Sequence, residues 1–168
     1  MQNLKFSNAG PSESKIISQL ADRIWRKYYP AIITLEQIDY MLVKMYSEES
    51  IQQQMKEGQK FTILYEDENP IGYCAVSTKD NANYFLHKLY VDVEQHSKGV
   101  GRILFDHILT SATNLKSMEL TVNRKNFKAI NFYFKMGFKI DRVADFDIGN
   151  GYFMNDFVMV RKCCFVDS

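Results

Sequence analysis

The chain has 168 residues, of which 46% are hydrophobic and 24% charged, and its 21 basic and 20 acidic side chains give a net charge of +1. This composition excludes a disordered chain, and the near balance of charge excludes a field that would steer the protein onto DNA or a membrane. A length in this range corresponds to one domain, so we expect a single domain over residues 1–168.

Three features of the sequence indicate the cellular compartment that we expect for the protein. No run of residues approaches the ~18 apolar positions of a membrane span, and the first residues lack the apolar stretch of a signal peptide. The three cysteines, Cys74, Cys163 and Cys164, cannot make a disulfide framework. We therefore expect a cytoplasmic protein with reduced thiols, no membrane partner and no nucleic-acid partner.

Residues 4–58 are predicted to form a short strand followed by three helices. After the strand Leu4–Ser7, apolar residues recur every four positions until Pro30, which indicates a helix. These positions are Ile16, Leu20, Ile24 and Tyr28. A capping-box pattern from Thr34 begins a second helix, whose expected apolar positions are Leu35, Ile38, Leu42 and Met45. A third, shorter helix is expected to bury Ile51 and Met55 and to end at Gly58.

Strand and helix patterns then alternate along the rest of the chain. The predicted strands are Phe61–Glu66, Ile71–Thr78, Tyr84–Val93, Ser117–Asn123, Phe138–Phe146 and Tyr152–Lys162. Helices are expected from Gly99 to about Asn114 and from about Asn126 to Met136. One strand–helix–strand crossover among antiparallel hairpins predicts an α+β fold, with a mixed, mostly antiparallel sheet of about seven strands flanked by helices.

The segment Val91–Arg102 joins a strand to a helix and carries two of the eight glycines, Gly99 and Gly101. Glycines let the backbone bend closely around a ligand, and a helix start offers free N–H groups that suit a phosphate. The P-loop pattern G-x-x-x-x-G-K-S/T is absent, and Leu104 stands where the dinucleotide fingerprint has its third glycine. The segment is thus either another kind of phosphate-binding turn or a glycine-rich helix start of structural value only.

From Gly99 onward this segment resembles the signature Q/R-x-x-G-x-G/A of the GNAT N-acetyltransferase superfamily, with His96 in place of glutamine or arginine. The stretch Asn126–Phe138 is similar to the second signature of that family, N-x-x-A-x-x-x-Y-x-x-x-G-F. The resemblance implies the GNAT fold, in which the β-α-β crossover holds acetyl-coenzyme A. Within Asp22–Ser47, the sequence is also similar to bacterial spermidine/spermine acetyltransferases.

The resemblance implies transfer of an acetyl group from acetyl-coenzyme A to a primary amine. Tyr133 would be the general acid toward the departing thiolate, and backbone N–H groups of Leu89–Val91 would contact the acetyl carbonyl. The implied coenzyme-binding residues are Leu89, Tyr90, Val91, His96, Ser97, Lys98, Gly99, Val100, Gly101, Arg102, Asn126, Ala129 and Phe132.

The general base stays open in the sequence. Some family members keep a glutamate immediately before the valine of the fifth strand, and here that position is Thr121. His87, Glu119 and a water held by backbone are the alternatives, although shared strand parity with Leu89 and Val91 favours a buried structural role for His87.

We expect the acceptor to be a small cationic amine such as a polyamine. Trp25 and Tyr28 either pack in a helical core or form an aromatic wall beside a cation. Four aspartates of the last hairpin, Asp141, Asp145, Asp147 and Asp156, are either solvated or attract a cationic acceptor. The candidate acceptor-binding residues are Trp25, Tyr28, His87, Asp147 and Asp156.

Two other functions stay open, namely acetylation of a protein N-terminus or lysine, and a regulatory module that binds coenzyme A without turnover. His87, His96 and His107 do not have metal-ligand spacing, so we expect no metal. An exposed edge of the sheet or the last strand would allow a homodimer.

Overall fold

A computed structural model describes residues 3–163, so Cys164 lies outside the described residues. The strands are β1 (Leu4–Ala9), β2 (Lys60–Glu66), β3 (Asn69–Thr78), β4 (Asn83–Val91), β5 (Ser117–Asn123), β6 (Lys139–Gly149) and β7 (Tyr152–Lys162). The α-helices are α1 (Ser14–Tyr28), α2 (Leu35–Tyr46), α3 (Glu48–Lys56), α4 (Val100–Ser111) and α5 (Phe127–Lys135). Within residues 3–163, no helix combines the length and apolarity that crossing a membrane requires.

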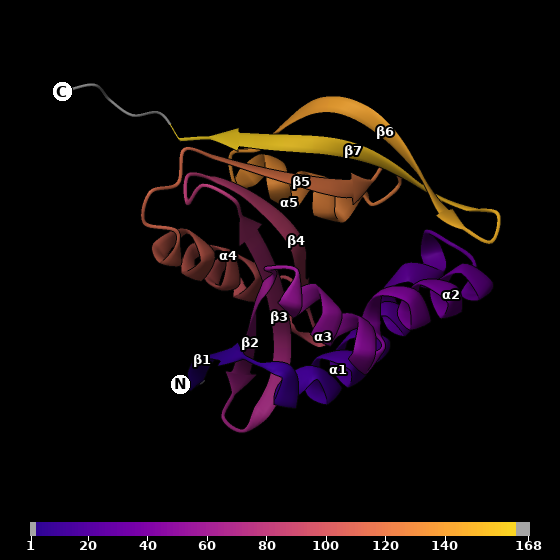
Figure 1. Ribbon diagram of the computed structural model, residues 1–168, viewed down its shortest axis with the longest axis horizontal. Helices are drawn as coiled ribbons and strands as arrows, with labels where there is room; N and C mark the ends of the chain where they lie inside the picture. The colour runs from indigo at the N-terminus through magenta and orange to yellow at the C-terminus, as the bar shows by residue number, and fades with distance from the viewer. Residues whose placement is uncertain (1–2, 164–168) are drawn as a thin grey trace. The chain divides into compact units, whose positions relative to one another are not determined.

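The seven strands form one sheet in the order β1-β2-β3-β4-β5-β7-β6 (Figure 1). The pairs β1–β2, β2–β3, β5–β7 and β6–β7 are antiparallel, whereas β4 and β5 are parallel. The predicted α+β fold and the predicted order of elements are therefore confirmed. Two compact units make up the chain, one of Met1–Ser77 with His87–Ser111 and one of Thr78–Leu86 with Ala112–Ser168.

In the first unit, α1, α2 and α3 pack on one another and β1, β2 and β3 form an antiparallel ladder. The buried residues of α1 include Ile17, Leu20 and Ile24, whereas the predicted inward residue Ile16 is only partly buried. Residues spaced strictly four apart drift around a helix by about 40° per step, so they do not stay on one face. The buried face of α1 instead starts at Ile17 and continues at intervals of three and four residues. Leu35, predicted to be inward, is 60% exposed in the first turn of α2.

The crossover begins where β4 and β5 run side by side. Their ladder holds Asn83–Phe85 against Ser117–Glu119 and ends there, six residues before the end of β4. The strand stops at Val91 rather than at the predicted Val93, because the Asp92 N–H donates to Ile71 at 2.8 Å and Val93–Gln95 then forms a 3₁₀ turn.

In the second unit, β5 pairs with β7 and β7 with β6 (Figure 1). Buried and half-buried residues alternate along β5, as the pattern of Met118, Leu120 and Val122 predicted. The hairpin turn falls at Asn150 and Gly151, between the two predicted strands, but β6 extends to Gly149 rather than to Phe146.

Candidate functional site

The segment between β4 and α4 leaves backbone N–H groups free at a helix start. Gly99 has φ of 80°, and its carbonyl accepts the Ile103 N–H at 3.1 Å, which begins α4. Within the described residues, the N–H groups of Gly99, Val100, Gly101 and Arg102 have no backbone acceptor. A Cβ added at Gly99 would meet no atom within 4 Å, so the space beside the turn is open. Such a helix start can bind a phosphate group.

Two cations border these N–H groups. The Lys98 side chain precedes Gly99 in an exposed position, and the Arg102 side chain is exposed in the first turn of α4. Arg102 Nε lies 3.7 Å from the Asp106 carboxylate, a loose and solvated pair that leaves most of the guanidinium donors available. Ser97, with φ of 65°, is also exposed. The segment is therefore chemically suited to an anion.

His96 is turned back onto the strand that precedes it. Its Nε2 lies 3.0 Å from the Val91 carbonyl, to which it donates in the tautomer that carries the proton there. Its ring also meets the Tyr28 ring edge-on, with centroids 5.7 Å apart. His96 therefore connects the segment between β4 and α4 to the end of β4. Tyr28 lies half-buried beside it.

The side chains of β4 follow a parity that differs from the expected one. Leu86 and Lys88 are buried, while His87 and Leu89 are only partly buried. His87 Nε2 lies 2.7 Å from Ser77 Oγ, and burial, with a smaller effect of the Lys88 charge, lowers the pKa of His87 to about 4. The expected burial of His87 together with Leu89 and Val91 is thus found only in part, because Val91 is buried while His87 and Leu89 are half-buried. A neutral imidazole with this pKa is a weak base at pH 7.

Lys88 is the buried cation that the sequence did not single out. The side chain is 8% exposed, and its Nζ donates to Gln54 Oε1 at 2.6 Å and to Gln59 Oε1 at 3.1 Å. The rings of Tyr46 and Phe61 lie 5.5 and 5.4 Å from the ammonium. Burial lowers the pKa of Lys88 to about 8. The period-two pattern of Leu86, Lys88 and Tyr90 is the signal that could have placed it inward.

Several aromatic residues of the first unit form one cluster. Trp25 stacks on Tyr29 with centroids 4.3 Å apart and lies 5.8 Å from Tyr90, while Tyr73 lies 5.5 Å from Tyr90. Trp25 is only 3% exposed, so its ring serves mainly as core. Tyr28 lies at the border of this cluster, where it is half-buried and edge-on to Tyr29. Of the two aromatic candidates for acceptor binding, Tyr28 is thus the more accessible.

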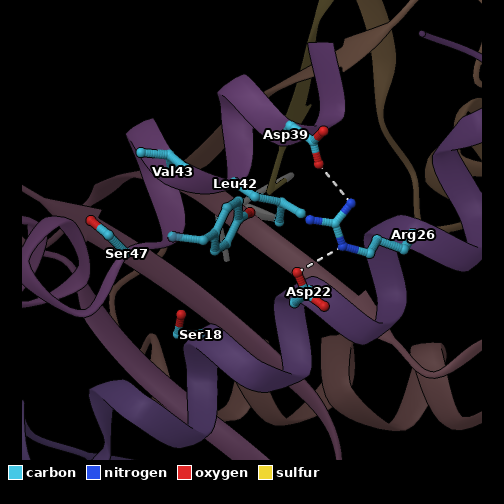
Figure 2. A pocket seen from close by; sticks show the side chains of 8 residues that line it. Ser18, Asp22, Arg26, Asp39, Leu42, Val43 and Ser47 are labelled. Atoms are coloured by element: carbon cyan, nitrogen blue, oxygen red, sulfur yellow. Dashed lines mark hydrogen bonds and ion pairs between the residues drawn. The ribbon is translucent and has the colours of Figure 1, made fainter. Parts of the chain in front are cut away.

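A pocket of about 380 Å³ opens between α1 and α2 of the same unit. Its lining residues are Ser18, Asp22, Arg26, Asp39, Leu42, Val43, Tyr46 and Ser47. Figure 2 shows the Arg26 guanidinium reaching both carboxylates, with bonds of 2.9 Å to Asp22 and 2.7 Å to Asp39. These side chains are about half-exposed, so the pairs are solvated surface interactions.

The second motif fixes the two ends of α5. Asn126 is buried, and its Oδ1 accepts the Ala129 N–H at 3.3 Å, which caps the helix start. At the other end Gly137 has φ of 92°, a left-handed conformation that favours glycine, and the Phe138 N–H donates to the Tyr133 carbonyl at 3.0 Å. Asn126, assigned to the coenzyme by the resemblance, thus has a structural role here as well.

Tyr133 is held between these two ends. It is 9% exposed, and its ring packs edge-on against Phe132 and Phe138, with centroids 5.4 and 5.6 Å away. Ala129, one helical turn earlier, is partly exposed, as is Phe132. The spacing of the motif therefore positions a tyrosine hydroxyl on a well-capped helix.

The four hairpin aspartates are not equivalent. Asp141 accepts from Arg142 at 2.8 Å, Asp145 from Arg124 at 2.8 Å, and Asp147 from the Gly149 N–H at 2.9 Å, and all three are exposed. These three carboxylates are solvated and hydrogen-bonded within the second unit, which agrees with the first of the two alternatives that the sequence left open.

The fourth aspartate, Asp156, is only 5% exposed. It lies opposite Asn123 in the β5–β7 ladder, and the Thr121 hydroxyl donates to its carboxylate. Burial raises the pKa of Asp156 to about 6 despite this bond. The sequence predicted Asp156 as a candidate for acceptor binding together with Asp147, but nothing local indicated that Asp156 alone of the four aspartates is buried.

Comparisons with known proteins place these features in a family. Residues 31–147 match the family model described as "Acetyltransferase (GNAT) domain". The uncharacterized N-acetyltransferase Rv2669 of Mycobacterium tuberculosis is 35% identical over 94 residues, which are 55% of this chain and 60% of the relative. The matched region thus spans less than two thirds of that relative.

Two further relatives carry different names. The peptidyl-lysine N-acetyltransferase YjaB of Escherichia coli is 28% identical over 106 residues, 62% of this chain and 67% of the relative. The spermidine N(1)-acetyltransferase of Thermoplasma acidophilum is 25% identical over 151 residues, 86% of this chain and 88% of the relative.

A solved structure agrees in fold. The PaiA N-acetyltransferase from Thermoplasma acidophilum, solved in complex with coenzyme A, has a TM-score of 0.80 and 23% identity, with 96% of this chain and 99% of that chain covered. The family model covers well over half of the chain, and both signature stretches lie within it. The chain therefore belongs to the GNAT acetyltransferase family.

Proposed function

We propose that the protein transfers an acetyl group from acetyl-coenzyme A to a primary amine of a small cationic acceptor. The observation that carries this proposal is the row of free N–H groups at Gly99–Arg102, bordered by Lys98 and Arg102 and facing open space. In a chain of this family, these donors and cations fit the pyrophosphate of coenzyme A. The related structure with coenzyme A bound supports the same assignment.

Each part of the chain has a distinct task in this proposal. The bound coenzyme supplies the acetyl group as a thioester. Ser97–Arg102 hold its phosphates, while Ala129 and Phe132, partly exposed on α5, pack against its arm. His96 positions the phosphate-binding segment through its bond to Val91 rather than through a contact of its own with phosphate.

Two groups act on the reacting atoms. Backbone N–H groups of Leu89–Val91 donate to the thioester carbonyl oxygen and stabilise the negative charge that forms on it. The Tyr133 hydroxyl donates its proton to the departing thiolate. The caps at both ends of α5 restrict the position of that hydroxyl, which is what proton transfer to a single sulfur requires.

A polyamine is the acceptor that the observations favour. The similarity to a spermidine acetyltransferase extends over 86% of the chain, and the last hairpin adds carboxylates of the sign that a polyamine needs. A lysine side chain in a protein is the second candidate, because YjaB is similar over 62% of the chain. Both acceptors present the same reacting group, a primary alkylamine.

Release of free thiol tests the proposal. The protein would be mixed with acetyl-coenzyme A and, separately, spermidine, spermine, putrescine, a lysine peptide or no acceptor. We expect release only with a polyamine, and a loss of tenfold or more in kcat for Tyr133→Phe. Tyr65→Phe is the matched control and should keep the wild-type rate.

The possible results separate the parts of the proposal. Release with the lysine peptide alone would favour the protein acceptor. An unchanged rate in Tyr133→Phe would remove the acid role while leaving the reaction. Coenzyme binding measured by calorimetry without release on any acceptor would support a module that binds coenzyme A without turnover.

A further inference from the structure

An amine attacks a thioester only in its neutral form, so the acceptor ammonium must first lose a proton. Four ionisable groups of the described chain are candidates for the base that takes this proton. His87 has a pKa of about 4, Glu119 lies 3.7 Å from Arg142 at the surface, and Asp92 is bound by Arg23. Asp156 is the remaining group, and within residues 3–163 it forms no ion pair.

We propose that Asp156 is the general base, which takes the proton of the acceptor ammonium through its buried carboxylate. This inference rests on the proposed acetyl transfer and adds a catalytic residue to it. It replaces His87 and Glu119, the side chains that the sequence offered for this role.

The position of Asp156 supports this assignment. It faces Asn123 across the β5–β7 ladder, and Thr121, two residues earlier on the same face of β5, donates a hydrogen bond to it. The chain then passes from Asn123 to the cap of α5, the helix that carries Tyr133.

The charges around Asp156 keep it ionisable near neutrality. Arg124 lowers the pKa of Asp156 and Asp145 raises it, but the Arg124 guanidinium bonds Asp145 at 2.8 Å and reaches only the backbone carbonyl of Asp156, at 3.4 Å. The Thr121 bond favours the carboxylate, while burial, the largest effect, favours the acid. The flanking residues Asn155 and Phe157 are uncharged. No cation thus fixes the carboxylate in its ionised form.

The proton balance of the step is complete. Asp156 accepts a proton from the acceptor R–NH3⁺, and the resulting R–NH2 forms a C–N bond with the acetyl carbon. The C–S bond breaks, and the thiolate takes the proton of the Tyr133 hydroxyl. The acylated nitrogen then loses its second proton to the Tyr133 oxygen, which restores the hydroxyl, and Asp156 releases its own proton to solvent, so the net products are the N-acetylamine, free thiol and one proton.

Kinetics over pH 5–9 with spermidine test the assignment. In the wild type, kcat should rise through about pH 6 as Asp156 ionises and then level off. Asp156→Asn should lose about 100-fold or more in kcat, keep its KM for acetyl-coenzyme A, and lose the inflection near pH 6. Asp39→Asn, on α2, is the control and should retain the wild-type profile.

Thr121→Val provides a second and milder variant. Removing the hydroxyl that donates to the carboxylate should move the inflection to higher pH while leaving the plateau rate within about threefold. A carbon-13 NMR titration of the aspartate carboxyls, assigned with Asp156→Asn, gives a readout without turnover. One carboxyl should titrate near pH 6, and its midpoint should rise in Thr121→Val.

The outcomes distinguish this inference from the proposed function. Unchanged kcat in Asp156→Asn with a KM that rises with acceptor charge would mean that Asp156 binds the acceptor instead, and would overturn the base role. An NMR midpoint near that of an ordinary aspartate would also overturn it. A wild-type protein that acetylates no acceptor would contradict the proposed function itself, and the base role with it.

Discussion

Within residues 3–163, each of the two units buries one aspartate, and the two carboxylates have different partners. Asp92, at the end of β4, is 6% exposed and receives the Arg23 guanidinium through two bonds, 2.6 and 3.1 Å long. Asp156, on β7, is 5% exposed and receives a hydroxyl. Because a buried charge is costly unless it is paired, the first arrangement stabilises a turn, whereas the second retains an unpaired carboxylate. Because its carboxylate has no ion-pair partner, Asp156 can exchange a proton near neutral pH.

The largest effect that we expect on stability is a gain in Asp156→Asn. The pKa of Asp156 is raised from about 3.8 to about 6, so the folded state binds the proton more tightly than the unfolded state does. Wild-type stability therefore falls as the pH rises through that window, and the loss is complete above about pH 6. A shift of this size corresponds to at most about 3 kcal/mol.

Urea unfolding of wild type and Asp156→Asn at pH 4 and pH 8 measures this effect. The variant should be more stable than the wild type at pH 8, and the advantage should shrink at pH 4, where the wild-type carboxyl is mostly protonated. Equal stability at both pH values would show that burial of Asp156 costs nothing, and the contrast with Asp92 would disappear.

Within the part of the chain that the structure describes, Lys88 and Asp156 are buried without an ion pair, and their partners were the hardest features to predict from the sequence. Period-two alternation located β5 at Ser117–Asn123, and the spacing from Asn126 to Gly137 located α5 and its caps. These signals are local, since each depends on residues within one or two turns of each other. The fold and the motif residues could therefore be predicted.

Burial of Asp156 could not be predicted from local sequence, and the partners of both Lys88 and Asp156 are distant along the chain. The Lys88 ammonium reaches Gln54 and Gln59, which lie 34 and 29 residues earlier. Asp156 meets Thr121 from a strand separated by α5 and β6. Only the register of the sheet brings these residues together, and a lone lysine or aspartate in a strand is more often solvated.

Asp92→Asn should have a smaller effect than Asp156→Asn, and of the opposite sign. The change leaves the Arg23 guanidinium without its counter-ion, but the Arg23 side chain is 43% exposed and water compensates in part. We expect a loss of about 1–2 kcal/mol in the free energy of unfolding at pH 7. A double-mutant cycle with Arg23→Gln isolates the pair, and a coupling energy near zero would contradict its structural role.

The smallest effect belongs to the ion pairs at the surface pocket between α1 and α2. Arg26 bonds both Asp22 and Asp39, so by geometry it is better paired than Arg23, yet all three side chains are about half-exposed or more. Solvent already screens these charges, and Arg26→Gln should therefore cost less than about 1 kcal/mol. The loss should shrink further when unfolding is measured in 1 M salt, because exposed charges are screened there. A loss as large as that in Asp92→Asn would mean that the number of carboxylate partners, rather than burial, sets the strength of an ion pair in this protein.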